Sequence, residues 1–307
     1  MNEGNAISGP AEEGQLGPTW ARLATVAAKL SDQSRDQRYH VFDVFDWPSE
    51  LPTDQHWMSP ELTTCYGTPV WDRLSETDRL RLTQAEAVNF FSLNVHLIRD
   101  LIGEVAGRIY DTRYPGLSEF FHDFIHEENE HMWFFAQFCN RYGGRVYGTK
   151  RVVGQAAEGN DAIRDVMVFG RILIAEELCD YFNAKMATDT RLPEIAQRIN
   201  AVHHQDESRH IAFGRQMMWA LYDEATRNAT PEEVERAATY LSRYITSCLR
   251  AFYNPAVYAD AGLDGARRIR SEVIGDPYRQ EFHRAVMRKT TRFFGRMGLF
   301  TEEAVAW

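Results

Sequence analysis

Two Glu-x-x-His pairs constrain the fold of this chain more than any other feature of its sequence. Glu128 stands three residues before His131, and Glu207 stands three residues before His210, in two separate segments. Because an α-helix turns about 100° per residue, each pair projects from one face of a helix. His203, four residues before Glu207, lies on the same stripe. The pairs therefore predict two helices that meet at a metal site.

Helical patterning extends well beyond these pairs. Four consecutive stretches have helical spacing of apolar residues, at residues 74–110, 118–144, 161–187 and 191–225, and two more follow at 231–253 and 277–300. Ser75 is a good N-cap for the first stretch, and Gly143-Gly144 is a stop signal for the second. Alternating period-2 runs are absent, so we expect an all-α protein. The residues before about Glu76 contain prolines and are expected to be irregular and to wrap the core.

The third helical stretch carries acids in its apolar middle, at Glu176 and Glu177. A buried carboxylate is costly unless it is paired or binds a metal. Glu176 is the preferred ligand because it lies about 31 residues before Glu207, which suits antiparallel helices that meet at one level. With both Glu-x-x-His pairs, this is the ligand pattern of a carboxylate-bridged dimetal site in a four-helix bundle.

The ligand from the first stretch stays open. If the chain turns near residues 111–114, counting equally on both sides of the turn places Ile98 opposite Glu128, and Ile98 cannot bind a metal. The ligand-capable neighbours are His96, Asp100 and Glu104, which form one row at i, i+4 and i+8. We expect one of these three to complete the site.

Composition excludes several other classes of protein. The 307 residues carry a formal charge of −10, which argues against a general nucleic-acid binder. No apolar run is long enough to span a membrane. Four scattered cysteines, none in a C-x-x-C pair, suit a reducing cytoplasm. Residues 1–18 have the composition of a disordered leader, which leaves residues 19–307 as one expected domain.

The segments "EENEH", "AEEL" and "HHQDESRH" resemble the p-aminobenzoate N-oxygenase family of ferritin-like diiron oxygenases. "YGTPVWDRLS" and "FYNPAVYADAGLD" also look like segments of that family, and the likeness covers roughly residues 60 to 290. The family has a further histidine four residues before the last Glu, and His203 matches it. The family's first-helix Glu has no clear counterpart in this chain.

The resemblance implies a ferritin-like four-helix bundle with additional N- and C-terminal helices. It also implies two iron ions, O₂ as co-substrate, an external electron donor with a redox partner, and a homodimer. The implied reaction oxygenates a small molecule, and N-oxygenation of an arylamine in natural-product biosynthesis is the founding case. The implied metal ligands are Glu128, His131, Glu176, His203, Glu207 and His210, with one first-helix group. Four aromatic residues are candidates for the substrate pocket or for plain core: Trp133, Phe134, Phe135 and Phe169.

Three alternatives remain at this point. The chain could be a C–H hydroxylase of the same family, or a ferritin-like iron-handling protein or oxidase without an organic substrate. It could also be a non-catalytic helical interaction protein whose buried charges are only ion pairs. For His203 the alternative is a hydrogen-bonding role beside the ligands.

Overall fold

The computed structural model describes residues 18–148 and 161–307, and within these ranges the chain is helical and has no strand. The leader expected at residues 1–18 therefore lies outside the described residues, except for Pro18, which begins the first helix. The helices are α1 (Pro18–Asp36), α2 (Pro69–Arg73), α3 (Glu76–Ala106), α4 (Ser118–Tyr142), α5 (Asp161–Met186), α6 (Glu194–Asn228), α7 (Pro231–Ala251), α8 (Pro255–Asp260), α9 (Ala266–Ile274) and α10 (Pro277–Met297), with short 3₁₀ turns at Pro60–Leu62 and Glu302–Ala304.

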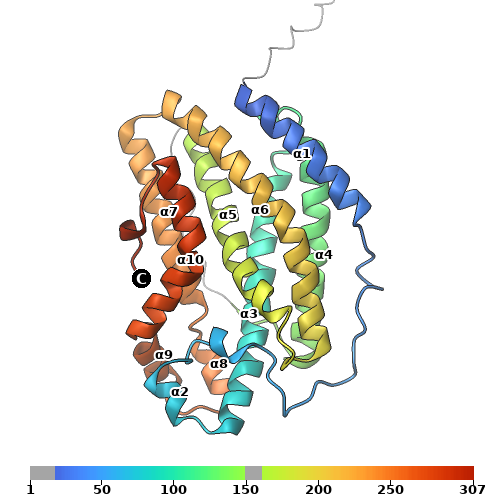
Figure 1. Cartoon of the computed structure of the whole chain (residues 1–307), viewed down its shortest axis with the longest axis vertical. Helices are drawn as coiled ribbons and strands as arrows, with labels where there is room; N and C mark the ends of the chain where they lie inside the picture. The colour runs from blue at the N-terminus through green and yellow to red at the C-terminus, as the bar shows by residue number, and fades with distance from the viewer. Residues whose placement is uncertain (1–17, 149–160) are drawn as a thin grey trace, which may run out of the picture.

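Helices α3 to α6 form a four-helix bundle (Figure 1). The most extensive packing joins α5 to α6 and α3 to α4. α3 also contacts α5, and α4 contacts α6, so each helix touches both of its neighbours around a common core. This is the ferritin-like arrangement expected from the sequence, and the expectation of an all-α fold is confirmed.

Additional helices cover the two sides of the bundle. α1 packs against α6 and α4 on one side, whereas α7 and α10 pack against α5 on the other (Figure 1). The helical conformation of residues 18–36 corrects the expectation that the first 76 residues are irregular. Its apolar positions Leu23, Ala27 and Leu30 are buried, so α1 is an ordinary amphipathic helix. Residues 254–265, which lie outside the helical stretches expected from the sequence, include the short helix α8.

The helix boundaries follow local signals in the sequence. The side chain of Ser75 accepts a hydrogen bond from the backbone N–H of Asp78, and the Asp78 carboxylate accepts one from the backbone N–H of Ser75. The two bonds form a capping box at the start of α3. Thr230 and Glu233 form the same arrangement at the start of α7. α4 ends directly before Gly143, in agreement with the expected stop.

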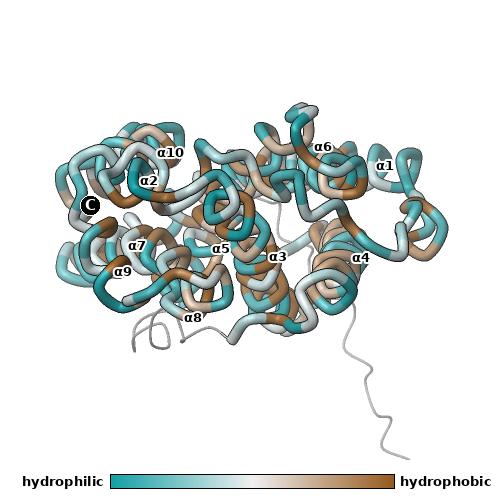
Figure 2. Tube along the Cα trace, turned by 90° about the horizontal axis from the view of Figure 1, so that it is seen from below, coloured by the Kyte–Doolittle hydropathy of each residue, from teal (hydrophilic) through white to brown (hydrophobic). Residues whose placement is uncertain are grey.

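Hydrophobic residues are concentrated on the inner faces of the bundle helices, most clearly along α3 and α4 (Figure 2). A group of acids and histidines nevertheless lies within this core, and several members are completely shielded from solvent: Glu128, His131 and Glu207 are each 0% exposed. Charged groups at such depth require partners or a bound cation.

Candidate metal centre

The two Glu-x-x-His pairs meet in the middle of the bundle. Ligand atoms of Glu128 and His131 from α4 and of Glu207 and His210 from α6 all lie within 4.8 Å of one another. Both helices present their pair from one face, as the i, i+3 spacing requires. The four side chains, which we call the metal cluster, are buried.

Two further residues expected at the site contact the metal cluster. His203 places Nε2 2.9 Å from Oε1 of Glu207. Glu176 from α5 is buried beside Glu207, whose negative charge raises the pKa of Glu176. Glu177, the alternative on α5, instead accepts hydrogen bonds from Arg215 Nε at 2.7 Å and from Thr290 Oγ1 at 2.5 Å. Glu177 therefore belongs to a separate ion pair, which agrees with the preference for Glu176.

The metal cluster has the donor atoms of a cation site. Both carboxylate oxygens of Glu128 and of Glu207 lack a hydrogen-bond partner within the described chain, and so do the Nδ1 atoms of His131 and His210. His210 Nδ1 lies 2.8 Å from Oε1 of Glu128, but the two atoms are not aligned as donor and acceptor. Buried carboxylate and imidazole atoms that converge in this way fit a metal ion of the iron, manganese or zinc type.

The charges of the metal cluster depend strongly on one another. Burial raises the pKa of Glu176 well above its usual value, and the nearby carboxylates of Glu207 and Glu128 raise it further. Burial opposes ionisation of Glu207, but His203 and His210 outweigh it and hold the pKa of Glu207 well below the usual range. Burial lowers the pKa of His131, yet Glu128 and Asp206 raise it to about 10. Protons thus balance the carboxylates in the metal-free site, and a bound metal ion would displace them.

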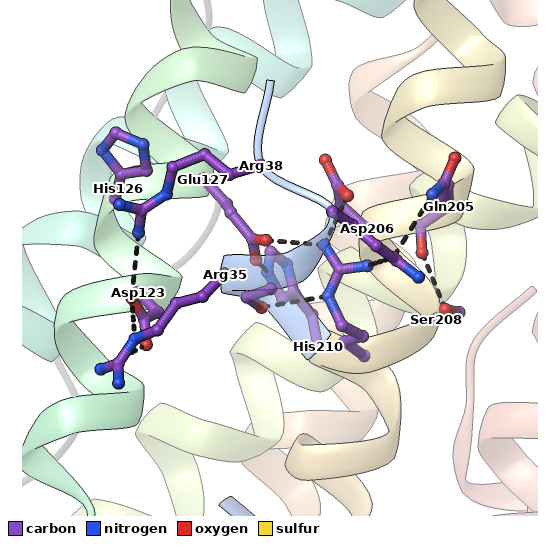
Figure 3. Close-up of polar contacts among 12 residues, drawn as sticks. Arg35, Arg38, Asp123, His126, Glu127, Gln205, Asp206, Ser208 and His210 are labelled. Carbon is purple, nitrogen blue, oxygen red and sulfur yellow. Dashed lines mark hydrogen bonds and ion pairs between the residues drawn. The ribbon is translucent and has the colours of Figure 1, made fainter. Parts of the chain in front are cut away.

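A second layer of charged residues holds the two imidazoles from behind. Asp206 on α6 accepts a hydrogen bond from His131 Nε2 at 3.0 Å, and Glu127 on α4 accepts one from His210 Nε2 at 2.8 Å. The guanidinium of Arg209 donates to both acids, at 2.5 Å to Asp206 and 2.6 Å to Glu127. Figure 3 shows Glu127 and His210 directed toward each other. Each helix thereby fixes the imidazole of the opposite helix, with Nδ1 left facing the cluster.

The segment at and after α1 closes this layer from outside. Tyr39 Oη donates to Asp206 at 3.2 Å, Ser34 Oγ accepts from Arg209 Nε at 3.1 Å, and Gln37 Oε1 accepts from Arg209 at 2.6 Å. The sequence analysis did not identify Asp206 or Arg209. The available signal was an acid directly before each ligand Glu.

The three candidate ligands on α3 form hydrogen bonds or ion pairs with groups outside the metal cluster. His96 Nε2 lies 2.8 Å from the backbone oxygen of Tyr147. The side chain of Asp100 is 64% exposed and pairs with Arg99. Glu104 forms ion pairs with two arginines, at 2.9 Å to Arg171 and 3.1 Å to Arg108. Among the described residues, the structure brings none of the three into the metal cluster.

A cavity of about 840 Å³ lies between α3, α5 and α7. Its apolar wall includes Leu97 and Leu101 of α3 and Ala175 and Leu178 of α5, so it runs beside the α5 turn that carries Glu176. Arginines and acids that pair with one another line another part, among them Arg108, Asp165 and Arg171.

The four aromatic residues that were candidates for the substrate pocket or for plain core pack into the hydrophobic core or against it. Phe134, Phe135 and Phe169 are buried in the hydrophobic core, and Trp133 packs against Phe42 and Trp47. None of the four residues that were candidates lines the cavity between α3, α5 and α7.

The fold and the site define a helical-bundle protein with a buried carboxylate–histidine cluster. The family model described as P-aminobenzoate N-oxygenase AurF matches residues 22–298, so the chain belongs to this family and is an O₂-dependent oxidase. Uncharacterised proteins of Mycobacterium bovis and Mycobacterium tuberculosis are each 22% identical to it over 252 residues, which are 77% of this chain and 70% of theirs.

Among solved structures, a single-residue variant of an R2-like ligand-binding oxidase with an aerobically reconstituted Mn/Fe cofactor is similar in fold. The TM-score is 0.50 at 14% sequence identity, and the match covers 96% of each chain. The likeness supports the ferritin-like fold. No helix among the described residues is long and apolar enough to cross a membrane.

Proposed function

We propose that this protein is a non-haem diiron oxygenase that N-oxygenates a small amine, most simply an arylamine, in natural-product biosynthesis. The observation that carries the proposal is the convergence of unpartnered, buried carboxylate and imidazole atoms from α4 and α6 in the middle of the bundle. Membership of the N-oxygenase family supplies the reaction class.

In this proposal the residues of the cluster have distinct roles. Glu128 lies 2.8 Å from His210 and 3.5 Å from His131, so its carboxylate would hold an ion together with either histidine. Glu207 lies 3.5 Å from His210 and 3.8 Å from His131, and it would act in the same way. His131 and His210 would each bind one ion, and Glu176 and His203 would complete the set. Two reduced iron ions held there would supply electrons for the activation of O₂.

The outer residues of this chain prepare the ligands. Asp206 and Glu127 accept the Nε2 protons of His131 and His210, which fixes the orientation of both rings with each Nδ1 atom directed at the cluster. Arg209 neutralises both acids and holds them in register. The imidazoles are therefore oriented before an ion binds.

The cavity between α3, α5 and α7 is the proposed substrate site. Its volume of about 840 Å³ suits a small organic molecule, and its apolar wall suits an aromatic ring. This cavity favours an enzyme with an organic substrate over an iron-handling protein. An external electron donor with its redox partner, a homodimer, a single domain at residues 19–307 and a cytoplasmic location complete the proposal. The four cysteines are buried as free thiols, in keeping with a reducing compartment.

The test uses the full chain loaded with Fe(II) under anaerobic conditions and then exposed to ¹⁸O₂. A panel of arylamines and other amines should accelerate O₂ consumption, and the amine product should gain ¹⁸O at nitrogen. Label at carbon instead would replace N-oxygenation by C–H hydroxylation. O₂ consumption that no organic compound changes would favour the iron-handling alternative. A protein that retains no iron would leave only the non-catalytic reading.

A further inference from the structure

Contacts between α3 and α5 fix which part of α3 lies level with the metal cluster. The rings of Phe90 and Phe182 stack at 5.2 Å between centroids, and Glu104 pairs with Arg171 at 2.9 Å. The two helices are antiparallel, so interpolation between these contacts places Glu176 opposite Leu97 and Ile98.

At this level no carboxylate or imidazole of α3 joins the metal cluster, and the half-buried His96 directs its Nε2 to the backbone oxygen of Tyr147. The buried residues of α3 within one turn are Asn94, Ile98 and Leu101, and Leu97 packs against the core beside them. The only polar side chain of the four, Asn94, donates its amide to the backbone oxygen of Phe90 at 2.9 Å. The usual dimetal bundle draws a ligand from each of its four helices, and the inner face of α3 departs from that pattern.

His203 lies beside the metal cluster and is 2% exposed. Its ring centroid lies 4.6 Å from that of His131, and its Nε2 atom faces Glu207. Its Nδ1 atom contacts the side-chain amide of Asn183 on α5, a residue that is 0% exposed. The other amide atom, Asn183 Oδ1, has no hydrogen-bond partner within the described chain. With the amide N and O exchanged, Oδ1 faces His203 and accepts its Nδ1 proton.

We infer that the metal centre is built by α4, α5 and α6 alone, from three Glu and three His. His203, oriented by Asn183, supplies the donor that α3 lacks. This inference rests on the proposed dimetal centre and adds the identity of its ligand set. Asn183 is a positioning residue: with its oxygen on the Nδ1 proton, the Nε2 lone pair of His203 points into the cluster.

The ligand set has an electrostatic consequence. The carboxylates of Glu128, Glu176 and Glu207 carry three negative charges, whereas two divalent ions carry four positive charges. A neutral imidazole in place of a fourth carboxylate leaves one positive charge uncompensated in the core. The second ion should therefore bind more weakly than the first.

The first experiment measures metal binding by anaerobic equilibrium dialysis against Fe(II) and, separately, Co(II), with elemental analysis of the full chain. The wild-type protein should bind two ions in two classes of affinity. Asp100→Asn, Glu104→Gln and His96→Gln should each leave both affinities unchanged, whereas His203→Ala should remove or weaken one ion. A carboxylate introduced by Ile98→Glu should tighten the second ion.

Matched controls separate position from charge. Ala106→Glu adds the same charge to an exposed position of α3 and should not change either affinity. Loss of one ion in any of the three α3-row variants, or equal tight binding of both ions by the wild type, would overturn the inference and leave the dimetal proposal standing. Failure of the wild type to bind either ion would overturn both.

The second experiment tests Asn183 through a readout other than activity. Asn183→Leu removes the acceptor for the His203 Nδ1 proton and should weaken one ion by about 10–100-fold. Asn183→Asp retains an acceptor and should restore the affinity. The absorption bands of the Co(II)-loaded protein report ligand geometry, so they should change in Asn183→Leu and be retained in Asn183→Asp. Identical spectra and affinities in both variants and the wild type would show that Asn183 does not position the ligand.

Discussion

Replacing Arg209 by leucine tests whether the residues behind the histidines stabilise the bundle. Arg209 is 5% exposed and is the only cation in the described structure that contacts both Asp206 and Glu127. In Arg209→Leu these two buried carboxylates lose their shared partner. Each keeps its bond to a histidine, at 3.0 Å for Asp206 and 2.8 Å for Glu127, so neither is left fully isolated.

The magnitude follows from the contacts that are lost. Two charge-assisted hydrogen bonds contribute about 1.5–3 kcal/mol each, and breaking a buried ion pair typically costs about 3–5 kcal/mol. We expect a loss of about 3–5 kcal/mol in the free energy of unfolding of the metal-free protein. Metal affinity should fall by about 10–100-fold, because the imidazoles lose their fixed orientation. Arg209→Lys keeps the charge but cannot hold both acids in the same planar geometry, so its losses should be smaller but measurable.

The assay is urea unfolding of the metal-free protein, followed by circular dichroism and extrapolated to water. Arg227→Leu is the matched control, because Arg227 lies on the same helix and forms an exposed i, i+4 pair with Asp223 at 2.9 Å. Such a pair contributes about 0.3–0.5 kcal/mol. If Arg209→Leu were as stable as Arg227→Leu and bound metal as the wild type does, the proposed supporting role of Arg209 would be refuted.

Three predictions concern groups away from the metal cluster. Burial raises the pKa of Glu86 to about 7 despite hydrogen bonds from Thr64, so at intermediate pH the folded state keeps a proton that the unfolded state has lost. The free energy of unfolding therefore falls as pH rises through this range. In urea unfolding, Glu86→Gln should reduce this loss between pH 5 and 8 by up to about 3 kcal/mol. Burial lowers the pKa of His283 to about 3, so the contribution of the neutral imidazole to stability is present above about pH 6.5 and is lost as pH falls. His283→Gln should diminish the loss of unfolding free energy between pH 7 and 5 by up to about 2 kcal/mol, and an unchanged pH profile would contradict this. A Cβ on Gly170 would lie 2.6 Å from Leu241 Cδ1, so Gly170→Ala should cost about 1–3 kcal/mol, and combining it with Leu241→Ala should cost less than the sum of the two single changes.

The bundle could be predicted from the sequence because its signals are local. The stretch expected at residues 118–144 is α4 at Ser118–Tyr142, and the stretch expected at 161–187 is α5 at Asp161–Met186. Apolar periodicity, caps and glycine stops lie within these segments themselves. α1 was not predicted because its buried face combines a few apolar residues with serines, and because it is stabilised by packing against α4 and α6.

The α3 position was harder because it depends on distances between helices. Counting back from Glu128 across the connection estimates which α3 residue lies at the same height in the bundle, but not which way its side chain points. The connection between α3 and α4 also spans residues 107–117, which is too long for equal counting on its two sides to be accurate. The acids at the correct spacing had other partners. Glu104 is followed four residues later by Arg108, an i, i+4 pair that indicates an ion pair rather than a free ligand. Its second partner, Arg171, is 67 residues away and could not be foreseen.

The residues that orient the histidines follow a pattern that becomes clear only when two helices are considered together. An acid directly precedes each ligand Glu: Glu127 before Glu128, and Asp206 before Glu207. One step along a helix turns a side chain by about 100°, so each acid leaves its own cluster face and points toward the neighbouring helix. There Glu127 holds the histidine of α6, and Asp206 holds the histidine of α4. Each helix thus carries one Glu and one His of the metal cluster and the acid that holds the other helix's imidazole, so a shift of either helix along its axis would disturb both histidines at once.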